Sequence, residues 1–221
     1  MKIIALAAAA TVAGTVAFAS GPTVPYDPPV APPMAVATYD WTGIYAGGTL
    51  GVGSTRHRVP GFGGAFPDAT GGMAGGVVGY NVQRGNMVFG GEAALNWANL
   101  SGSAACINPA WTCTSDVSAL GSIRGRLGYA NDRTLVYVTG GVGAARIAHS
   151  TTTGGPVFSD TNTRTGWTLG LGVEQAMNNG WIFRGQFDYY RFGGSDYALD
   201  VPYLDEHTNI GTVSFSVLRR F

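Results

Sequence analysis

The feature that most constrains the fold of this chain is a two-residue alternation of side chains that recurs between turn-forming residues. Successive side chains of a β-strand point to opposite faces, so each segment with this alternation is expected to form a strand. The eight expected strands are Trp41–Ser54, Gly72–Gln83, Met87–Ala98, Asp116–Ala130, Leu135–His149, Arg164–Met177, Gly180–Phe192 and His207–Phe221.

The gaps between these segments alternate in length. The short gaps are residues 84–86, 131–134 and 178–179. The long gaps are residues 55–71, 99–115, 150–163 and 193–206. Outer-membrane barrels have short periplasmic turns and longer external loops. The pattern therefore predicts an all-β fold, an eight-stranded antiparallel up-and-down transmembrane β-barrel with short periplasmic turns and four longer external loops.

The chemistry of the two strand faces indicates which face meets lipid. In Gly180–Phe192, large apolar or aromatic residues share one parity and polar residues the other: Trp181, Phe183, Phe187 and Tyr189 oppose Arg184, Gln186 and Asp188. In Asp116–Ala130 the division sets Val117, Ala119, Ile123, Leu127 and Tyr129 against Ser118, Ser122, Arg124 and Arg126. A lipocalin keeps its apolar side chains inside, whereas here the bulky apolar face is expected outside, against lipid.

The N-terminal residues indicate export. A short basic start, Met1-Lys2, precedes an apolar run that ends in the small-residue pattern Ala17-Phe18-Ala19. We therefore expect residues 1–19 to be a cleavable signal peptide. Residues 20–40 contain six prolines and are expected to form an extended periplasmic leader, with the barrel at 41–221. No apolar run after residue 19 is long enough for a transmembrane helix.

Charge is sparse and balanced. The chain has 13 Lys and Arg against 13 Asp and Glu, and Lys2 is the only lysine. The chain has no excess of basic residues that would suggest a nucleic-acid partner. Cys106 and Cys113 lie in a polar stretch with no nearby histidine. In an exported protein these two cysteines predict a disulfide that closes a short loop rather than a metal site.

Six charged residues are expected on the inward faces of the strands: Glu92, Arg124, Arg126, Glu174, Arg184 and Asp188. Arg146 is a candidate fourth cation. Because an isolated charge inside a narrow barrel is costly, these residues should form a lumenal network of paired charges. An eight-stranded barrel is only just wide enough for its own side chains, so the favoured prediction is a plugged lumen. The alternative is a narrow, weakly conducting pore whose ion preference these charges set.

The three histidines are the candidates for an enzymatic site. His57, His149 and His207 lie in or beside the predicted long loops, where a surface hydrolase of the barrel type would place its site. No G-x-S-x-G motif accompanies them, so they are expected to be solvated loop residues without a catalytic role. The G-x-G patterns lie within expected strands and precede no helix, so they do not indicate a nucleotide site. We expect no cofactor and no metal.

Several motifs resemble those of a known family. Trp41-Thr42-Gly43-Ile44-Tyr45-Ala46-Gly47 resembles the opening of small alphaproteobacterial outer-membrane surface antigens, the opacity-like porin family. Residues 122–130 (S-I-R-G-R-L-G-Y-A), 137–141 (Y-V-T-G-G) and 164–174 (R-T-G-W-T-L-G-L-G-V-E) are similar to later strands of these proteins. The resemblance covers essentially the whole chain after the signal peptide. It implies an eight-stranded barrel like the OmpA membrane domain, with structural, immunogenic or host-contact roles.

The expected function is that of an integral protein of the Gram-negative outer membrane with a structural and surface-interaction role. A small porin for passive diffusion of ions or small solutes is the alternative. The expected partners are outer-membrane lipid, the barrel-assembly machinery, and host or surface ligands at the loops. The terminal Phe221, with Val213, Phe215 and Val217 at the same parity, resembles the last-strand signal that the assembly machinery reads.

Overall fold

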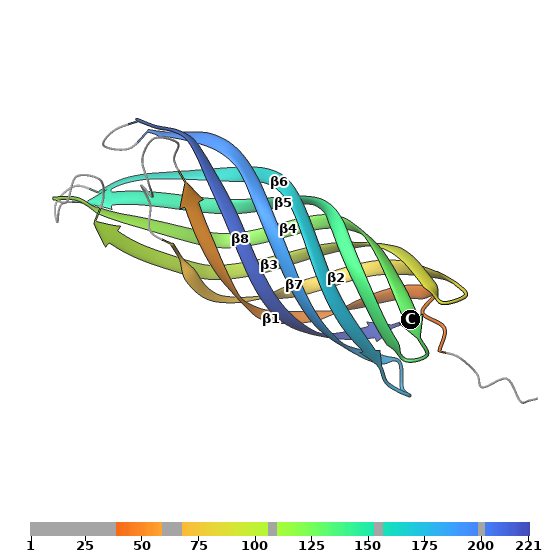
Figure 1. Ribbon diagram of the computed structural model, residues 1–221. Helices are drawn as coiled ribbons and strands as arrows, with labels where there is room; N and C mark the ends of the chain where they lie inside the picture. The colour runs from red at the N-terminus through yellow and green to blue at the C-terminus, as the bar shows by residue number, and fades with distance from the viewer. Residues whose placement is uncertain (1–38, 59–67, 106–109, 153–156, 199–201) are drawn as a thin grey trace, which may run out of the picture. The chain divides into compact units, whose positions relative to one another are not determined.

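The computed structural model describes residues 39–58, 68–105, 110–152, 157–198 and 202–221. Its strands are β1 (Gly43–Arg58), β2 (Thr70–Arg84), β3 (Met87–Ala105), β4 (Thr112–Asn131), β5 (Thr134–Thr152), β6 (Val157–Ala176), β7 (Trp181–Ala198) and β8 (Pro202–Arg220). Each strand pairs antiparallel with its neighbours in the sequence, and β8 pairs with β1 to close the barrel (Figure 1). The predicted fold class is confirmed. The predicted signal peptide and residues 20–38 of the predicted leader lie outside the described residues.

The three short turns follow from local sequence. Gly85 joins β2 to β3 with a φ of 61°, and Gly180 precedes β7 with a φ of 81°. Glycine adopts this left-handed conformation without a steric penalty. Asp132, between β4 and β5, is the one non-glycine residue with positive φ among the described residues. Aspartate tolerates this conformation better than most residues, so these residues favour tight reversals.

The strands continue farther than the sequence predicted at the opposite end of the barrel. β3 extends to Ala105 and β6 begins at Val157, so much of the predicted long gaps is paired strand. These extensions are rich in Ser and Thr, whose hydroxyls can bond across strands, as between Ser103 Oγ and Thr114 Oγ1 at 3.0 Å. Because the outward positions there are polar, as at Ser101 and Thr161, the apolar outer face that identified the strands is lost, and the predicted loops were too long.

The strands are staggered around the barrel. The pairing leads from Tyr45 through one partner on each successive strand and returns to β1 at Thr55, ten residues farther along. This stagger tilts the strands relative to the barrel axis and brings residues distant in sequence to the same level of the lumen. An eight-stranded barrel leaves an interior that side chains can fill.

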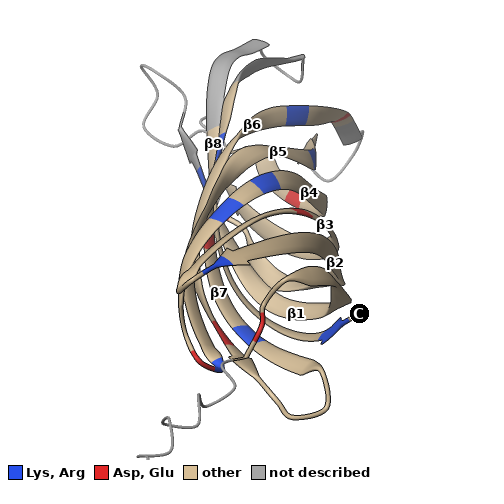
Figure 2. Ribbon diagram, turned by 90° about the vertical axis from the view of Figure 1, so that its right-hand side faces the viewer, with Lys and Arg blue, Asp and Glu red and all other residues tan. Residues whose placement is uncertain are grey.

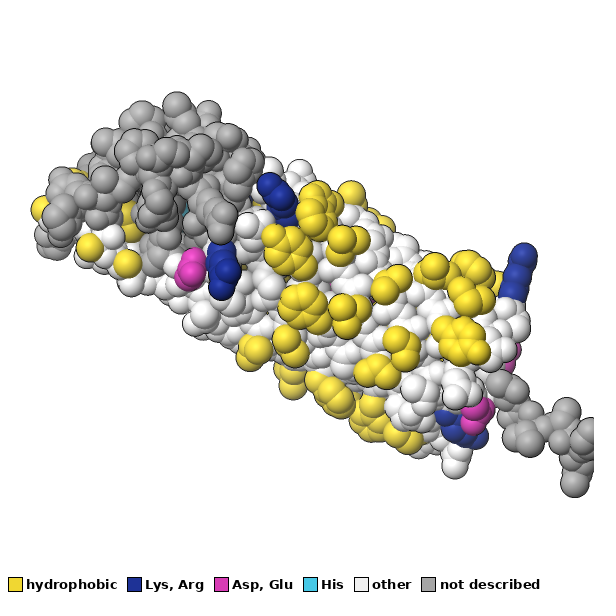
Figure 3. All heavy atoms as spheres, viewed as in Figure 1, with side chains coloured by type: hydrophobic (Ala, Val, Ile, Leu, Met, Phe, Trp, Pro, Cys, Tyr) yellow, Lys and Arg dark blue, Asp and Glu magenta, His cyan; other side chains and the backbone are white. Residues whose placement is uncertain are grey.

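An apolar belt covers the face of the barrel that Figure 3 shows, and exposed large apolar side chains on all eight strands continue it around the barrel. Leucine, valine and aromatic side chains there are more than one third exposed, including Leu50, Leu171 and Phe215. Aromatic residues lie at the belt's periplasmic border, such as Tyr129 and Trp181 near the strand ends. At the external border lie Trp97, Trp167 and Tyr189, beyond which the outward positions carry mainly Ser, Thr, Asn and Arg. This arrangement matches the apolar band and aromatic girdles of transmembrane barrels.

A β-bulge in β4 corrects part of the predicted facing. The pairing of β4 with β5 shifts between Val117 and Ala119. Val117, predicted to face lipid, is 1% exposed, whereas Ser118, predicted to face inward, is exposed. An extra residue in one strand reverses the parity of everything beyond it, which explains the error. Among the described residues, no helix is long and apolar enough to cross a membrane.

Candidate functional site: the lumenal charge network

The six charged residues predicted for the strand interior are all buried and contact one another inside the barrel. Figure 2 marks where charged residues occur along the strands. The six come from β3, β4, β6 and β7, and none is more than 5% exposed: Glu92, Arg124, Arg126, Glu174, Arg184 and Asp188. Two of their contacts follow from strand pairing, because Glu92 lies opposite Arg124 and Glu174 lies opposite Arg184. A third contact, between Arg126 and Glu92, also joins the neighbouring strands β3 and β4. The remaining contacts join strands that are not neighbours and cross the lumen.

Arg184 of β7 bridges the two glutamates. Its Nη1 lies 3.0 Å from Oε2 of Glu92, and its Nη2 lies 2.7 Å from Oε1 of Glu174. Its Nε donates a hydrogen bond of 2.8 Å to the same Glu174 oxygen. The Arg184 side chain therefore ties β3 to β6 and β7 through the centre of the barrel.

The two arginines of β4 complete the network. Arg124 lies 2.5 Å from Oε1 of Glu92 through Nη2 and 2.5 Å from Oδ1 of Asp188 through Nη1. Arg126 lies 2.8 Å from Oε1 of Glu174 through Nη2 and 3.7 Å from Oε2 of Glu92 through Nη1. Each arginine thus contacts two carboxylates, and the three positive and three negative charges balance. Such compensation is what allows charges to be buried at all.

Tyrosine and glutamine side chains, which sequence reasoning left out of the site, extend the network. The Tyr45 hydroxyl donates to Oε2 of Glu92 at 2.8 Å and accepts from Nη1 of Arg126 at 2.7 Å. The Tyr137 hydroxyl donates to Oε1 of Gln186 at 2.5 Å. The Arg126 guanidinium carbon lies 4.0 Å from the centroid of the Tyr137 ring, within cation–π range.

The glycines opposite these two tyrosines are the sequence feature that could have identified them as part of the site. Tyr45 pairs with Gly79, and Tyr137 pairs with Gly172. A Cβ atom at either glycine would collide with the hydroxyl of the tyrosine. The glycines therefore make room for rings that lie across the neighbouring strand. Once the strand pairing is known, a tyrosine opposite a glycine marks such a position.

Apolar side chains fill the lumen on both sides of the network. The periplasmic cluster comprises Trp41, Tyr45, Val77, Val88, Ala130, Leu135, Tyr137, Ala176, Ile182 and Leu218. The external cluster comprises Ala69, Leu100, Val117, Leu120, Ala145, Ile147, Tyr190, Phe192 and Ile210. The prediction of a polar inward face is therefore wrong at both ends of the barrel. The charge network thus lies between two layers of buried apolar side chains.

Residues just before β1 pack against the periplasmic end. Trp41 is 1% exposed, and its Nε1 donates to the carbonyl oxygen of Asp132 at 3.0 Å. Its backbone amide donates to Oε1 of Gln83 at 2.7 Å. The preceding Asp40 carboxylate accepts a hydrogen bond from the backbone amide of Thr42, which lowers the pKa of Asp40 below its usual value. Trp41 thereby joins the start of the barrel to the end of β2 and to the turn between β4 and β5.

Arginines depart from the predicted set in two places. Arg146, the candidate fourth lumenal cation, is exposed on the outer face of β5, while its neighbours Ala145 and Ile147 are buried. Arg164 is the fourth buried arginine instead, is 2% exposed, and donates from Nη1 to Oγ1 of Thr208 at 3.1 Å. Its even-numbered parity, shared with inward Thr168 and Glu174, was the signal that could have identified it.

The remaining candidate residues are the three histidines, the two cysteines and Phe221. His149, expected to be a solvated loop residue, is fully buried within β5 because that strand extends beyond its predicted end. His57 and His207 belong to β1 and β8, but their side chains lie outside the described residues. Cys113 is buried in β4, and the predicted disulfide stays a prediction because Cys106 lies outside the described residues. Phe221 is 76% exposed after the end of β8.

Comparison with known proteins agrees with this architecture. The family model described as "Outer membrane protein beta-barrel domain" matches residues 5–221. The chain is similar to the 31 kDa outer-membrane immunogenic protein of Brucella melitensis, with 32% identity over 244 aligned residues that cover all of both chains. It is also similar to the 22 kDa outer membrane protein of Rhizobium leguminosarum bv. viciae, with 30% identity over 167 residues, 72% of this chain and 68% of the relative.

Among solved structures, the outer membrane protease OmpT from Escherichia coli has a TM-score of 0.50 and 9% identity. The match covers 81% of this chain and 97% of that one. At this identity the likeness concerns the fold alone.

Proposed function

Because the chain belongs to the family of outer membrane β-barrel domains and lies in the outer membrane, we propose that it is a closed barrel with a structural and surface-interaction role. The observation that carries the proposal is the balanced network of three arginines and three carboxylates between two apolar clusters. The proposal includes no catalytic activity.

The energetics of the network favour closure. A solute that passes the centre of the barrel has to separate at least one of the buried ion pairs, whose closest atoms lie 2.5–3.7 Å apart. Breaking a buried pair without replacing the lost partner costs ~3–5 kcal/mol. Before and after this level the same solute has to displace buried apolar side chains such as Ile182 and Phe192. These successive barriers support a lumen closed to ions and small solutes.

The test is conductance of the pure refolded protein in planar lipid bilayers, together with swelling of liposomes in sugar solutions. We expect neither current steps nor swelling above that of protein-free membranes. A general porin inserted into the same membranes is the positive control. Stable current steps whose ion preference shifts in a Glu174→Gln variant would refute closure and support the small-porin alternative.

The external ends of the strands support the surface-interaction role. The outward positions beyond the apolar belt are exposed and polar, as at Ser101 and Ser103 of β3 and Thr161 and Thr163 of β6. The relatives from Brucella are named immunogenic proteins. We expect a Thr163→Cys variant to react with a membrane-impermeant maleimide on intact cells. An Asn178→Cys variant, at a short turn, should react only after the outer membrane is permeabilised. Labelling of both sites on intact cells would contradict this orientation.

Phe221 serves, in this proposal, as the signal for the barrel-assembly machinery. Its side chain is exposed, and its backbone amide donates to the carbonyl oxygen of Ile44 at 2.9 Å. A Phe221→Ala variant should therefore retain its free energy of unfolding in vitro but reach the membrane in smaller amounts. Heat-dependent mobility of the membrane fraction on SDS gels measures the folded amount. An unchanged amount in cells would refute the signal role.

A further inference from the structure

A row of polar side chains crosses the outer surface just above the apolar belt. Trp167 of β6 pairs with Arg191 of β7, Arg191 pairs with Asn209 of β8, and Asn209 pairs with Arg56 of β1. All four side chains point outward, because the residues on either side of Arg191 and Asn209 are buried. Neighbouring strands lie ~4.8 Å apart, so the two arginines are roughly 10 Å apart on either side of Asn209.

An apolar hollow lies directly below this row. It has a volume of about 550 Å³, and its lining includes Ser54, Phe187, Gly211 and Val213. Gly211 is two residues from Asn209 on the same face of β8. A Cβ atom there would have only the Phe187 ring within 4.0 Å. The missing side chain leaves bare backbone between Phe187, Val213 and Ser54.

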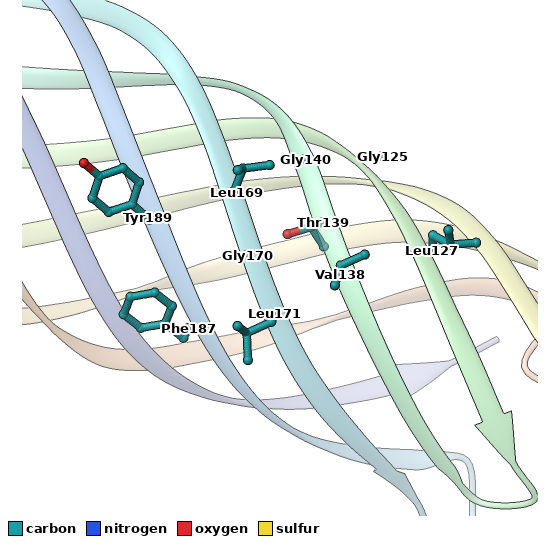
Figure 4. Close-up of a pocket in the computed structure, with 10 residues that line it drawn as sticks. All are labelled: Gly125, Leu127, Val138, Thr139, Gly140, Leu169, Gly170, Leu171, Phe187 and Tyr189. Carbon is teal, nitrogen blue, oxygen red and sulfur yellow. The ribbon is translucent and has the colours of Figure 1, made fainter.

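A second hollow lies on the other side of Phe187. It has a volume of about 500 Å³ and lies over Gly125 and Gly140, with Leu169 and Leu171 between them and Phe187 (Figure 4). Phe187 lines both hollows. Tyr189, whose ring centroid lies 5.7 Å from that of Trp167, stands between this hollow and the polar row.

We propose that the row Arg56–Asn209–Arg191 and the two hollows beneath it form a binding site for one phosphate-bearing glycolipid of the external leaflet. The guanidinium groups bind phosphate, the Asn209 amide donates to the sugar or phosphate, and acyl chains occupy the hollows on either side of Phe187. Arginine suits this role because its planar fork binds phosphate oxygens through paired hydrogen bonds. Trp167 and Tyr189 lie at the level where amphipathic rings prefer the boundary between acyl chains and headgroups.

The charges around the row favour an anionic ligand. Among the side chains that the structure describes, no acidic residue pairs with Arg191, whose strand partners are Trp167 and Asn209. One carboxylate approaches the other end of the row: Asp68 precedes Ala69, whose amide bonds to the Thr55 hydroxyl beside Arg56. Two basic side chains are visible where the apolar belt ends at its external border, one of them beside an acidic side chain and the other without one (Figure 3). Arg191 is therefore the residue on which binding should depend most.

The site faces lipid on the outside of the barrel, so this inference does not depend on whether the lumen is closed. The test uses the full refolded barrel in phosphatidylcholine nanodiscs that contain bisphosphoryl lipid A, monophosphoryl lipid A or phosphatidylglycerol. Native mass spectrometry after detergent extraction measures the lipid that stays bound. The wild-type chain should retain bisphosphoryl lipid A in preference to phosphatidylglycerol. Arg191→Gln should lower its retention about tenfold, as expected for the loss of one charge-assisted hydrogen-bonding group.

Arg146→Gln is the matched control, because Arg146 is also exposed beyond the belt but lies on β5, outside the row. It should retain the lipid as the wild type does. Gly211→Leu should lower retention with all arginines present, because its side chain fills the hollow. Equal losses in the Arg191 and Arg146 variants, unchanged retention in Arg191→Gln, or equal retention of phosphatidylglycerol would each overturn the proposal. Heat-dependent gel mobility verifies folding, and Arg56→Gln gives the same comparison if Arg191→Gln does not fold.

Discussion

Arg184 offers the most direct test of how the charge network stabilises the barrel. The side chain is 2% exposed and contacts Glu92 and Glu174 at 2.7–3.0 Å. Replacing it with methionine keeps a similar length of apolar side chain but removes its charge and its donors. Three carboxylates then face two arginines, Arg124 and Arg126. The change therefore leaves one negative charge uncompensated in the lumen.

The expected loss follows from the contacts that survive. Glu92 keeps Arg124 at 2.5 Å, and Glu174 keeps Arg126 at 2.8 Å, so neither carboxylate is left without a partner. Removing one partner from a buried ion pair destabilises proteins by ~3–5 kcal/mol. Because both carboxylates keep one arginine, we expect Arg184→Met to lower the free energy of unfolding by about 3 kcal/mol, the lower end of that range.

The measurement is urea-induced unfolding of the refolded barrel in lipid vesicles, followed by tryptophan fluorescence. The control is the double variant Arg184→Met/Glu174→Gln, which restores charge balance and leaves an amide oxygen to accept from Arg126. It should recover more than half of the loss, although Glu174→Gln alone is destabilising. The reasoning is refuted if Arg184→Met costs less than about 1 kcal/mol, the range of exposed ion pairs, or if the losses of the single variants simply add.

Two further predictions concern the two faces of the strands. Gly172→Ala should lower the free energy of unfolding by about 1–3 kcal/mol, because its Cβ would collide with the Tyr137 side chain, whereas Gly185→Ala, whose Cβ would meet only Val173 at an ordinary 4.0 Å, should not. Leu171→Arg places a charge in the apolar belt and should cost about 2–4 kcal/mol, whereas Thr163→Arg, on the same face of β6 beyond the belt, should cost at most about 1 kcal/mol. Urea unfolding in vesicles measures both pairs, and equal effects within either pair would contradict the corresponding assignment.

The local pattern of the sequence was sufficient for the strands and most of their facing. Side-chain direction alternates along a strand whatever its partners are, so the inward position of Glu92, Arg124 and Arg184 could be read without any knowledge of pairing. The same reasoning failed for Arg146. The run from Leu135 to Val138 is apolar on both faces, so it gives no parity from which to orient β5. The alternation pattern also did not reveal the bulge in β4.

Only the tertiary structure decided which side chains meet inside the barrel. The ten-residue stagger brings Arg126 of β4 to Glu174 of β6, and Arg184 of β7 to Glu92 of β3, although neither pair lies on adjacent strands. These contacts depend on strand tilt and barrel closure, which are properties of the whole sheet and of no single segment. The sequence by itself thus determined a membrane barrel with charges facing inward. Closure of the sheet determined their partners and the apolar layers that enclose them.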